Sequence, residues 1–304
     1  MQASDGSQDG FILVVVLGFL ALFSVVVLAL SHAIRLDVQA RSHLVSGARA
    51  EALADGLALL VAARLAEQQA GSPGKPLPAD GSPMRCRVGD NLVEISITDA
   101  TGLVDINAAP VELLERVLAG LGLPGQRAKA LAAAIGDFRD EDDEPLPNGA
   151  EAKEYLAAGL SHGPKNAPFD SVEELDQVIG MTRDVLTAMR EVVTVNAQSP
   201  ALEIRFSPPE LIAALAGLRS RLPISAQRIS NARARLQGEF ISLSGSLSKT
   251  QVVVVTVETA SKGRFRRRSV IEVNNAANLG FYVREWAPAP SRSISGYVAP
   301  FCSL

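Results

Sequence analysis

The feature that most constrains this chain is an apolar stretch close to its start. Residues 11–34 include no Asp, Glu, Lys or Arg. As an α-helix they would extend about 36 Å, which is enough to cross the hydrocarbon core of a bilayer. A secretory signal peptide usually begins with basic residues and has a shorter apolar core, but residues 1–10 contain no Lys or Arg. We therefore predict a transmembrane helix over 11–34.

Helical character continues beyond this segment. Residues 35–70 are rich in Ala, Leu, Arg and Glu, and their leucines recur at helical spacing. Residues 71–83 are rich in Pro and Gly and end the pattern. We expect one rod of roughly 85 Å that runs from the membrane to a folded body.

The folded body has a mixed pattern. Residues 84–88 and 92–98 are β-like runs on either side of turn residues, which predicts a hairpin. A helix is expected at about 210–221. Four segments rich in Val, Ile and aromatic residues predict an antiparallel sheet, at 240–243, 252–258, 265–273 and 281–286.

Between these two sets of strands, residues 105–196 are helical in pattern and hold a weak internal repeat. In the first unit, Asn107 is expected to cap a helix that enters at Pro110. In the second unit, Ser171 and Glu174 have the spacing of a capping box. Each unit contains a glycine-containing turn, so we predict two helix-hairpin-helix units.

Composition and charge limit the classes of function that the protein can have. The 304-residue chain is 47% hydrophobic, which supports a sizeable core, and its net charge of -4 provides no overall basic footprint for nucleic acid. The three histidines are isolated and no catalytic motif with its required context occurs, so we do not expect an enzyme. Cys86 and Cys302 fit either one disulfide bridge or two free thiols.

Residues 137–154 form the chemically richest segment. Crowded carboxylates either have raised pKa values or recruit a cation. If Asp140 is the first residue of a twelve-residue loop, several acids occupy EF-hand ligand positions, although Pro145 stands where that loop requires glycine. Oxygen ligands favour Ca²⁺ over zinc, and a solvated acidic loop is the alternative. We predict a structural calcium site with ligands from Asp137, Asp140, Asp142, Asp143, Glu144 and Glu151.

The predicted helix-hairpin-helix pair raises a rival function. In membrane-anchored DNA receptors of the competence type, such a pair grips phosphates through turn amides and basic side chains. Here the turns have few basic neighbours, and the acidic segment would repel phosphate. The basic run of Arg264, Arg266, Arg267 and Arg268 lies away from the turns and is expected at a solvated strand edge. DNA binding is therefore the less favoured alternative.

The order Gly10, Phe11 and a long apolar helix resembles the type IV pilins and pseudopilins. In that class a prepilin peptidase cleaves after the glycine and the new N-terminal residue is methylated, which places the cut between Gly10 and Phe11. The class usually has Glu as the fifth mature residue, where this chain has Val15. Loss of that Glu resembles the minor pseudopilin K family of type II secretion systems. The most specific stretches are LVDINAAPVELL at 103–114, FRDEDDEPLPNGAE at 138–151 and PKNAPFDSVEEL at 164–175.

This resemblance implies an α+β, pilin-like fold, in which the long N-terminal helix packs on an antiparallel sheet and an all-α domain of helix-hairpin-helix type is inserted. The implied divisions are a prepilin leader (1–10), a transmembrane helix (11–34), a helical stalk (35–70), a pilin-like body (71–104 and 197–304) and the insert (105–196).

The resemblance also implies a role: a minor pseudopilin at the tip of the pseudopilus that initiates filament assembly for protein export across the outer membrane. Its partners would be the minor pseudopilins I and J, through them the major pseudopilin, the prepilin peptidase and the inner-membrane assembly platform, with the secretin or exoproteins as further candidates. The chain would span the bacterial inner membrane once, with its C-terminal body in the periplasm. Calcium sites in the helical insert are known in that family.

Overall fold

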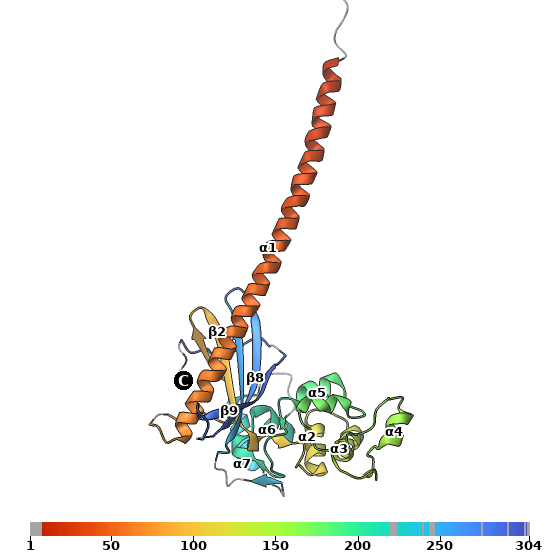
Figure 1. Ribbon diagram of the computed structural model, residues 1–304, viewed down its shortest axis with the longest axis vertical. Helices are drawn as coiled ribbons and strands as arrows, with labels where there is room; N and C mark the ends of the chain where they lie inside the picture. Colours follow the sequence, from red (N-terminus) through yellow and green to blue (C-terminus); the bar gives the residue numbers. More distant parts are fainter. Residues whose placement is uncertain are drawn as a thin grey trace, which may run out of the picture.

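The computed structural model describes residues 8–73, 75–218, 224–236, 238, 240–242, 247–274, 276–290, 292–300 and 302. One helix, α1 (Gln8–Gln69), projects far beyond the rest of the molecule (Figure 1). Two lobes lie at the other end of the chain, a sheet packed against α1 and a helical lobe beside it. The fold therefore combines helices with an antiparallel sheet.

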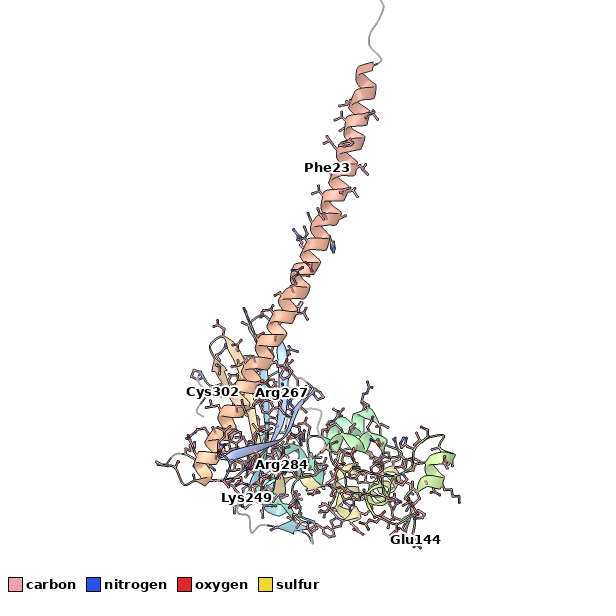
Figure 2. All side chains as sticks on the ribbon, viewed as in Figure 1. Phe23, Glu144, Lys249, Arg267, Arg284 and Cys302 are labelled. Carbon is pink, nitrogen blue, oxygen red and sulfur yellow. A yellow bond between two sulfur atoms is a disulfide. The ribbon has the colours of Figure 1, made fainter. Side chains whose placement is uncertain are left out.

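The two halves of α1 have different surroundings. The stretch Leu13–His32 is long and apolar enough to cross a membrane, and it is not buried inside the protein. Figure 2 shows Phe23 on this free part of the helix. In the other half, small side chains at four-residue spacing, Ala50, Ala54 and Ala58, are fully buried against the sheet. Such a stripe of small residues lets the helix approach the sheet closely.

The sheet has five antiparallel strands in the order β1-β2-β7-β8-β9. The hairpin predicted near residues 84–98 is confirmed, and its register pairs Cys86 with Val93. Along β2, Val93, Ile95 and Ile97 are fully buried with α1 on one face of the sheet, as period-2 alternation requires. The strands are β1 (Met84–Val88), β2 (Asn91–Asp99), β7 (Thr250–Glu258), β8 (Arg264–Val273) and β9 (Phe281–Pro288).

The helical lobe is built from residues that lie between β2 and β7 in sequence. Its α-helices are α2 (Val111–Gly120), α3 (Gly125–Arg139), α4 (Ala152–Ala157), α5 (Arg183–Met189), α6 (Pro209–Leu215) and α7 (Ala226–Arg235). Its short 3-10 helices are η2 (Val172–Gln177) and η3 (Ile204–Phe206), while η1 (Ala100–Gly102) leads into the lobe. Two parallel strand pairs join its ends, β3 (Val104–Asp105) with β4 (Val193–Thr194), and β5 (Leu202–Glu203) with β6 (Ile241–Ser242).

The predicted Asn107 cap is wrong, and Ser171 is an N-cap by position without the predicted capping box. Pro110 is the N-cap of α2, and the Asn107 amide instead exchanges two hydrogen bonds with the backbone of Phe169, at 2.7 and 2.9 Å. This exchange ties the start of the first unit to the loop before the second. Ser171 makes no side-chain capping bond, and η2 is a 3-10 helix. Glu174 is committed to an ion pair with Lys165 at 2.9 Å.

The second half of the chain departs from the predicted elements in three places. The segment predicted at 240–243 is not part of the antiparallel sheet, because its strand β6 pairs in parallel with β5. The helix expected at 210–221 is α6, which ends at Leu215 because Gly217 turns the chain with a φ of +64°. The core of the helical lobe also extends beyond residue 196. It includes Leu211 and Ile212 of α6 and Ile229 of α7, residues that sequence alone placed in the body.

Candidate functional site

The acidic segment forms a loop at the end of the helical lobe that lies farthest from α1, where Glu144 is labelled in Figure 2. Asp137, in the last turn of α3, organises this loop from a fully buried position. Its carboxylate accepts hydrogen bonds from the backbone N–H groups of Leu146, at 3.1 Å, and Ala150, at 2.6 Å. A Cβ at Gly149 would lie 1.9 Å from Asp137 Oδ2, so the loop closes this tightly only around glycine.

Several oxygen atoms in this loop are buried without a hydrogen-bond partner. They are Oδ1 of Asp140, both carboxylate oxygens of Glu151 and Oδ1 of Asn166. The Asn166 amide nitrogen donates to the backbone oxygen of Asp142, at 3.1 Å, and to Oδ1 of Asp143, at 2.9 Å. Buried acceptors are nearly always satisfied in folded proteins, so these oxygens are free to accept bonds from a cation or from water.

The electrostatics of the loop agree with this inference. Burial, followed by the charges of Asp137 and Asp140, raises the pKa of Glu151 to about 7. Burial also raises the pKa of Asp137, although two backbone hydrogen bonds oppose that effect. The pKa of Asp140 rises through burial and the nearby charge of Asp142. A cation would lower all three pKa values by favouring the ionised carboxylates.

The six predicted ligands do not form one compact cage. Asp137 and Glu151 are buried, whereas Asp142, Asp143 and Glu144 are exposed. The charges of Asp142 and Asp143 nevertheless raise the pKa of Glu151. Among the described residues, no three His, Cys, Asp or Glu side chains converge as a ready-made metal site. Asn166 was not predicted, because it lies outside the acidic run and neutral amides carry no charge signal. The calcium site therefore stays a prediction.

The local backbone explains why the loop differs from an EF-hand. Asn148, with a φ of +71°, adopts the left-handed conformation, and Gly149 N–H donates to the Leu146 carbonyl in the resulting turn. The sharp reversal thus comes after Pro145 instead of at the sixth loop position.

The basic run on β8 is not a solvated edge, so that prediction is wrong. β8 lies between β7 and β9, and Arg266 and Arg267 are each only 5% exposed. The Arg267 guanidinium bonds Asp55 of α1 at 2.6 Å and Glu51 at 3.0 Å. It also stacks over the rings of Phe265 and Trp286, at 4.8 and 5.2 Å from their centroids. These contacts fix α1 on the sheet.

All four arginines of that run are paired. Arg264 bonds Glu258, Arg266 bonds Glu191 and Arg268 bonds Glu285. Each arginine charge therefore already has a carboxylate partner within the protein, so little positive charge is available to bind nucleic-acid phosphates.

The remaining predicted sites lie at the two ends of the chain. Gly10 and Phe11 fall within the first turn of α1. Cys86 of β1 and Cys302 form a disulfide, with their Cα atoms 5.0 Å apart. The segment before Cys302 lies along β1, where Ala299 N–H donates to the Arg85 carbonyl at 2.9 Å.

Comparison with known proteins gives a consistent result. The family described as "Type II secretion system (T2SS), protein K" matches residues 91–198. The chain is 28% identical over 246 residues to the type II secretion system protein K of Klebsiella pneumoniae, an alignment that covers 75% of this chain and 76% of that protein. A similar protein of Pectobacterium carotovorum subsp. carotovorum is 28% identical over 127 residues, covering 40% of this chain and 38% of its own length.

A solved structure has a similar fold. It is a chain of the GspK-GspI-GspJ complex from the type 2 secretion system of enterotoxigenic Escherichia coli, with a TM-score of 0.53 and 19% sequence identity. The match covers 84% of this chain and 99% of that one.

Proposed function

We propose, from the premise that the chain belongs to the protein K family of type II secretion systems, that it is a minor pseudopilin at the tip of the pseudopilus and initiates filament assembly. The observation that carries this proposal is the agreement of the family match over residues 91–198 with a fold match over most of the chain. A type II secretion pseudopilin is a structural component, which agrees with the lack of a catalytic motif. None of the comparisons supports the DNA-binding alternative.

The anchor supports a single-pass location in the bacterial inner membrane. The free half of α1 presents large apolar side chains on all sides, such as Leu13 and Phe23, each about 60% exposed. Lipid, or the apolar helices of other pseudopilins, would cover these side chains. The C-terminal body would then lie in the periplasm, where the disulfide between Cys86 and Cys302 is stable.

Processing would convert the chain into its mature form. In the proposed scheme a prepilin peptidase removes residues 1–10 and Phe11 becomes the methylated N-terminus. Val15 then lacks the carboxylate that would pair with the amine of another subunit. A subunit without that carboxylate does not pair with the N-terminal amine of a further subunit. This property suits a position at the filament tip.

The architecture suits the tip for a second reason. In this proposal the sheet and the base of α1 correspond to a pilin-like body, and the helical lobe projects to one side of them (Figure 1). If such subunits were stacked along a filament, the helical lobe would clash sterically with neighbouring subunits. A single copy at the end of the filament would avoid this clash. The solved complex contains GspI and GspJ, so we propose the minor pseudopilins I and J as direct partners.

We further propose that the acidic loop binds a structural calcium ion. Asp140, Glu151 and Asn166 provide buried oxygens without hydrogen-bond partners, and Asp137 orders the loop that holds them. Oxygen ligands of this kind suit Ca²⁺, whose charge would offset the repulsion among the carboxylates. The exposed Asp142, Asp143 and Glu144 would complete the coordination only if the loop closes around the ion.

The first test is intact mass spectrometry of the full chain made with and without a prepilin peptidase. We expect a loss of residues 1–10 and the gain of one methyl group only when the peptidase is present. An unprocessed chain in both samples would contradict assignment to the filament. Co-purification with minor pseudopilins I and J, compared with the major pseudopilin alone, then tests the tip position. Binding to the major pseudopilin without I and J would refute it.

A further inference from the structure

The two lobes have separate apolar cores with a polar seam between them. One core joins α1 to one face of the sheet, and the other fills the helical lobe from Val104 to Ile229. The sheet face turned away from α1 has only a small apolar patch, formed by Leu103, Val252 and Val270 with Val254 beside it. A cavity of about 520 Å³ lies over this face, lined by residues of both lobes. Polar, incompletely packed contacts of this kind permit neighbouring domains to move.

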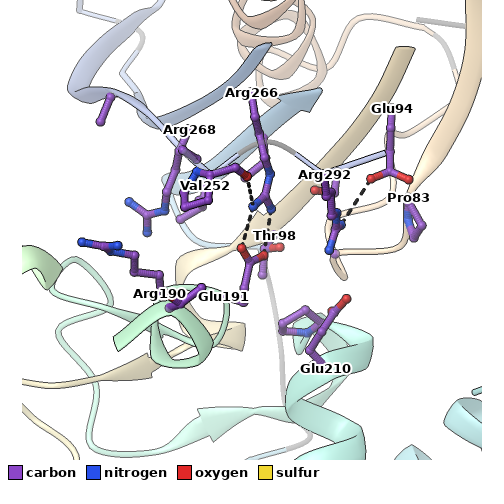
Figure 3. Close-up of a pocket in the computed structure, with 18 of the residues that line it drawn as sticks. Pro83, Glu94, Thr98, Arg190, Glu191, Glu210, Val252, Arg266, Arg268 and Arg292 are labelled. Atoms are coloured by element: carbon purple, nitrogen blue, oxygen red, sulfur yellow. Dashed lines mark hydrogen bonds and ion pairs between the residues drawn. The ribbon is translucent and has the colours of Figure 1, made fainter. Parts of the chain in front are cut away.

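One ion pair crosses this cavity, and Figure 3 shows it between β8 and the helical lobe. Arg266 of β8 donates to both carboxylate oxygens of Glu191, the second residue after α5, at 2.6 and 2.8 Å. The side chain of Arg266 is 5% exposed and that of Glu191 is 32% exposed. A bidentate pair with this burial is both strong and selective in its geometry.

Arg266 and Glu191 each favour the charged form of the other. Hydrogen bonding and charge from Arg266 outweigh burial and lower the pKa of Glu191, and Glu191 in turn raises the pKa of Arg266 despite its burial. Arg268 and Arg292 also lower the pKa of Glu191. Glu94 and Glu210 also raise the pKa of Arg266, so the pair is the strongest of several favourable contacts here. If the lobes separate, water replaces each charged partner. Separation therefore breaks the ion pair but leaves both apolar cores intact.

A different contact could act as the pivot. Gly102 of η1 lies so close to η3 that a Cβ there would be 2.2 Å from the Phe206 carbonyl oxygen. Nearby, Arg233 of α7 bonds Asp80 at 2.8 Å and the Ser207 carbonyl at 2.8 Å. The lobes are thus in backbone contact at this point, whereas a cavity separates them beneath Glu191.

We propose that the Arg266–Glu191 pair is a latch that holds the helical lobe closed over the sheet, and that the lobe opens about the Gly102–Phe206 contact when the pair breaks. The inference goes beyond the proposed secretion function. It makes the angle between the helical lobe and the long helix α1 variable, with the closed arrangement held by the latch. Opening would expose the sheet face that carries Val252 and Val254.

Two adjacent residues of β7 allow a test by thiol labelling in the full chain. Val252 is 4% exposed and faces the cavity, whereas Val253 is fully buried against the α1 core. The native cysteines are joined in a disulfide and would not react. Val252→Cys and Val253→Cys would each be treated with a maleimide that bears a bulky polyethylene glycol chain. The first reports opening of the seam, and the second reports unfolding of the body.

Glu191→Gln is the latch variant, and Glu285→Gln is its matched control, because Glu285 pairs with Arg268 between two strands of the same sheet at 2.5 Å. We expect Glu191→Gln to speed labelling of Val252→Cys by about 30-fold, the factor expected for loss of one partner of a buried ion pair. Glu285→Gln should leave the rate unchanged.

The other outcomes overturn the proposal. An unchanged rate at Val252→Cys in the Glu191→Gln protein would show that the pair does not control access to the seam. Equal acceleration at Val252→Cys and Val253→Cys would show that the pair supports global folding instead of a lobe movement. Acceleration by Glu285→Gln as large as that by Glu191→Gln would show that the effect belongs to the sheet face in general.

Discussion

Without calcium, the acidic loop should become less stable as the pH rises. The pKa of Glu151 is about 7 in the folded protein, against an ordinary value of 4.5. Below pH 4.5 the Glu151 carboxyl is protonated in both the folded and the unfolded chain, so it does not lower the free energy of unfolding. Between pH 4.5 and 7 the unfolded chain releases its proton first, and the free energy of unfolding falls. Above pH 7 it stays at the lower value.

The size of this effect follows from the two pKa values. A rise from 4.5 to about 7 corresponds to about 3 kcal/mol. Solvent around the exposed part of the loop screens the charges, so we expect a loss of roughly 1–2 kcal/mol between pH 5 and pH 8. Asp137 and Asp140 act in the same direction, because their pKa values are raised as well. Asp80 and Glu191 have lowered pKa values and lose their contribution only in more acidic solution, outside this window.

Hydrogen exchange of α3 and α4, followed by mass spectrometry of the full chain in detergent, would measure this loss. With a chelator present, and after correction for intrinsic exchange, protection should fall by about tenfold from pH 5 to pH 8. Glu151→Gln should flatten the profile, and calcium at pH 8 should restore protection in the wild-type chain. The reasoning is refuted if Glu151→Gln keeps the wild-type slope, or if calcium gives no protection at pH 8.

Three further substitutions test other parts of the structure, each by urea unfolding of the full chain. Gly149→Ala should destabilise the helical lobe by about 2–4 kcal/mol, because the new Cβ would meet the Asp137 carboxylate. Arg267→Met should cost about 2 kcal/mol, because it leaves the acids of α1 unpaired beside the sheet. Cys302→Ser should cost about 2–5 kcal/mol, because the disulfide with Cys86 closes a loop between residues 216 apart in sequence.

Each of these changes has a matched control. Gly125→Ala places a Cβ in open space at the start of α3 and should be close to neutral. Arg264→Met removes an arginine from the same strand as Arg267, but its ion pair is 43% exposed on the arginine side, so the change should stay within about 0.5 kcal/mol. Wild-type protein under reducing conditions should reproduce the loss seen with Cys302→Ser. Equal effects in a variant and its control would contradict the corresponding explanation.

The elements that could be predicted are those with a regular pattern. The uncharged start of the chain and its helical continuation indicated one long helix, and α1 has both parts without a break. The strands β7, β8 and β9 fall within two residues of the segments expected from their Val, Ile and aromatic content. The hairpin of β1 and β2 was visible because its turn residues are concentrated between two short runs.

The features that were missed depend on contacts between distant residues. Asn107 has the local signal of a helix cap, but its amide is used by the backbone of Phe169, 62 residues away. Four basic residues in one strand looked like a solvated edge. No local pattern shows that their acidic partners come from α1, β7, β9 and the turn that follows α5. Asn166 joins the acidic loop from another part of the lobe for the same reason.

The pairing of β2 with β7 has a consequence for the order of folding. Asp99 and Gln251 lie side by side in the sheet although 152 residues separate them. Joining the ends of a flexible segment of that length would cost much conformational entropy and slow the reaction. The segment instead folds back on itself through local helices and through β3 with β4 and β5 with β6, which bring its two ends together. The helical lobe should therefore form first and act as the template on which the central strands of the sheet meet.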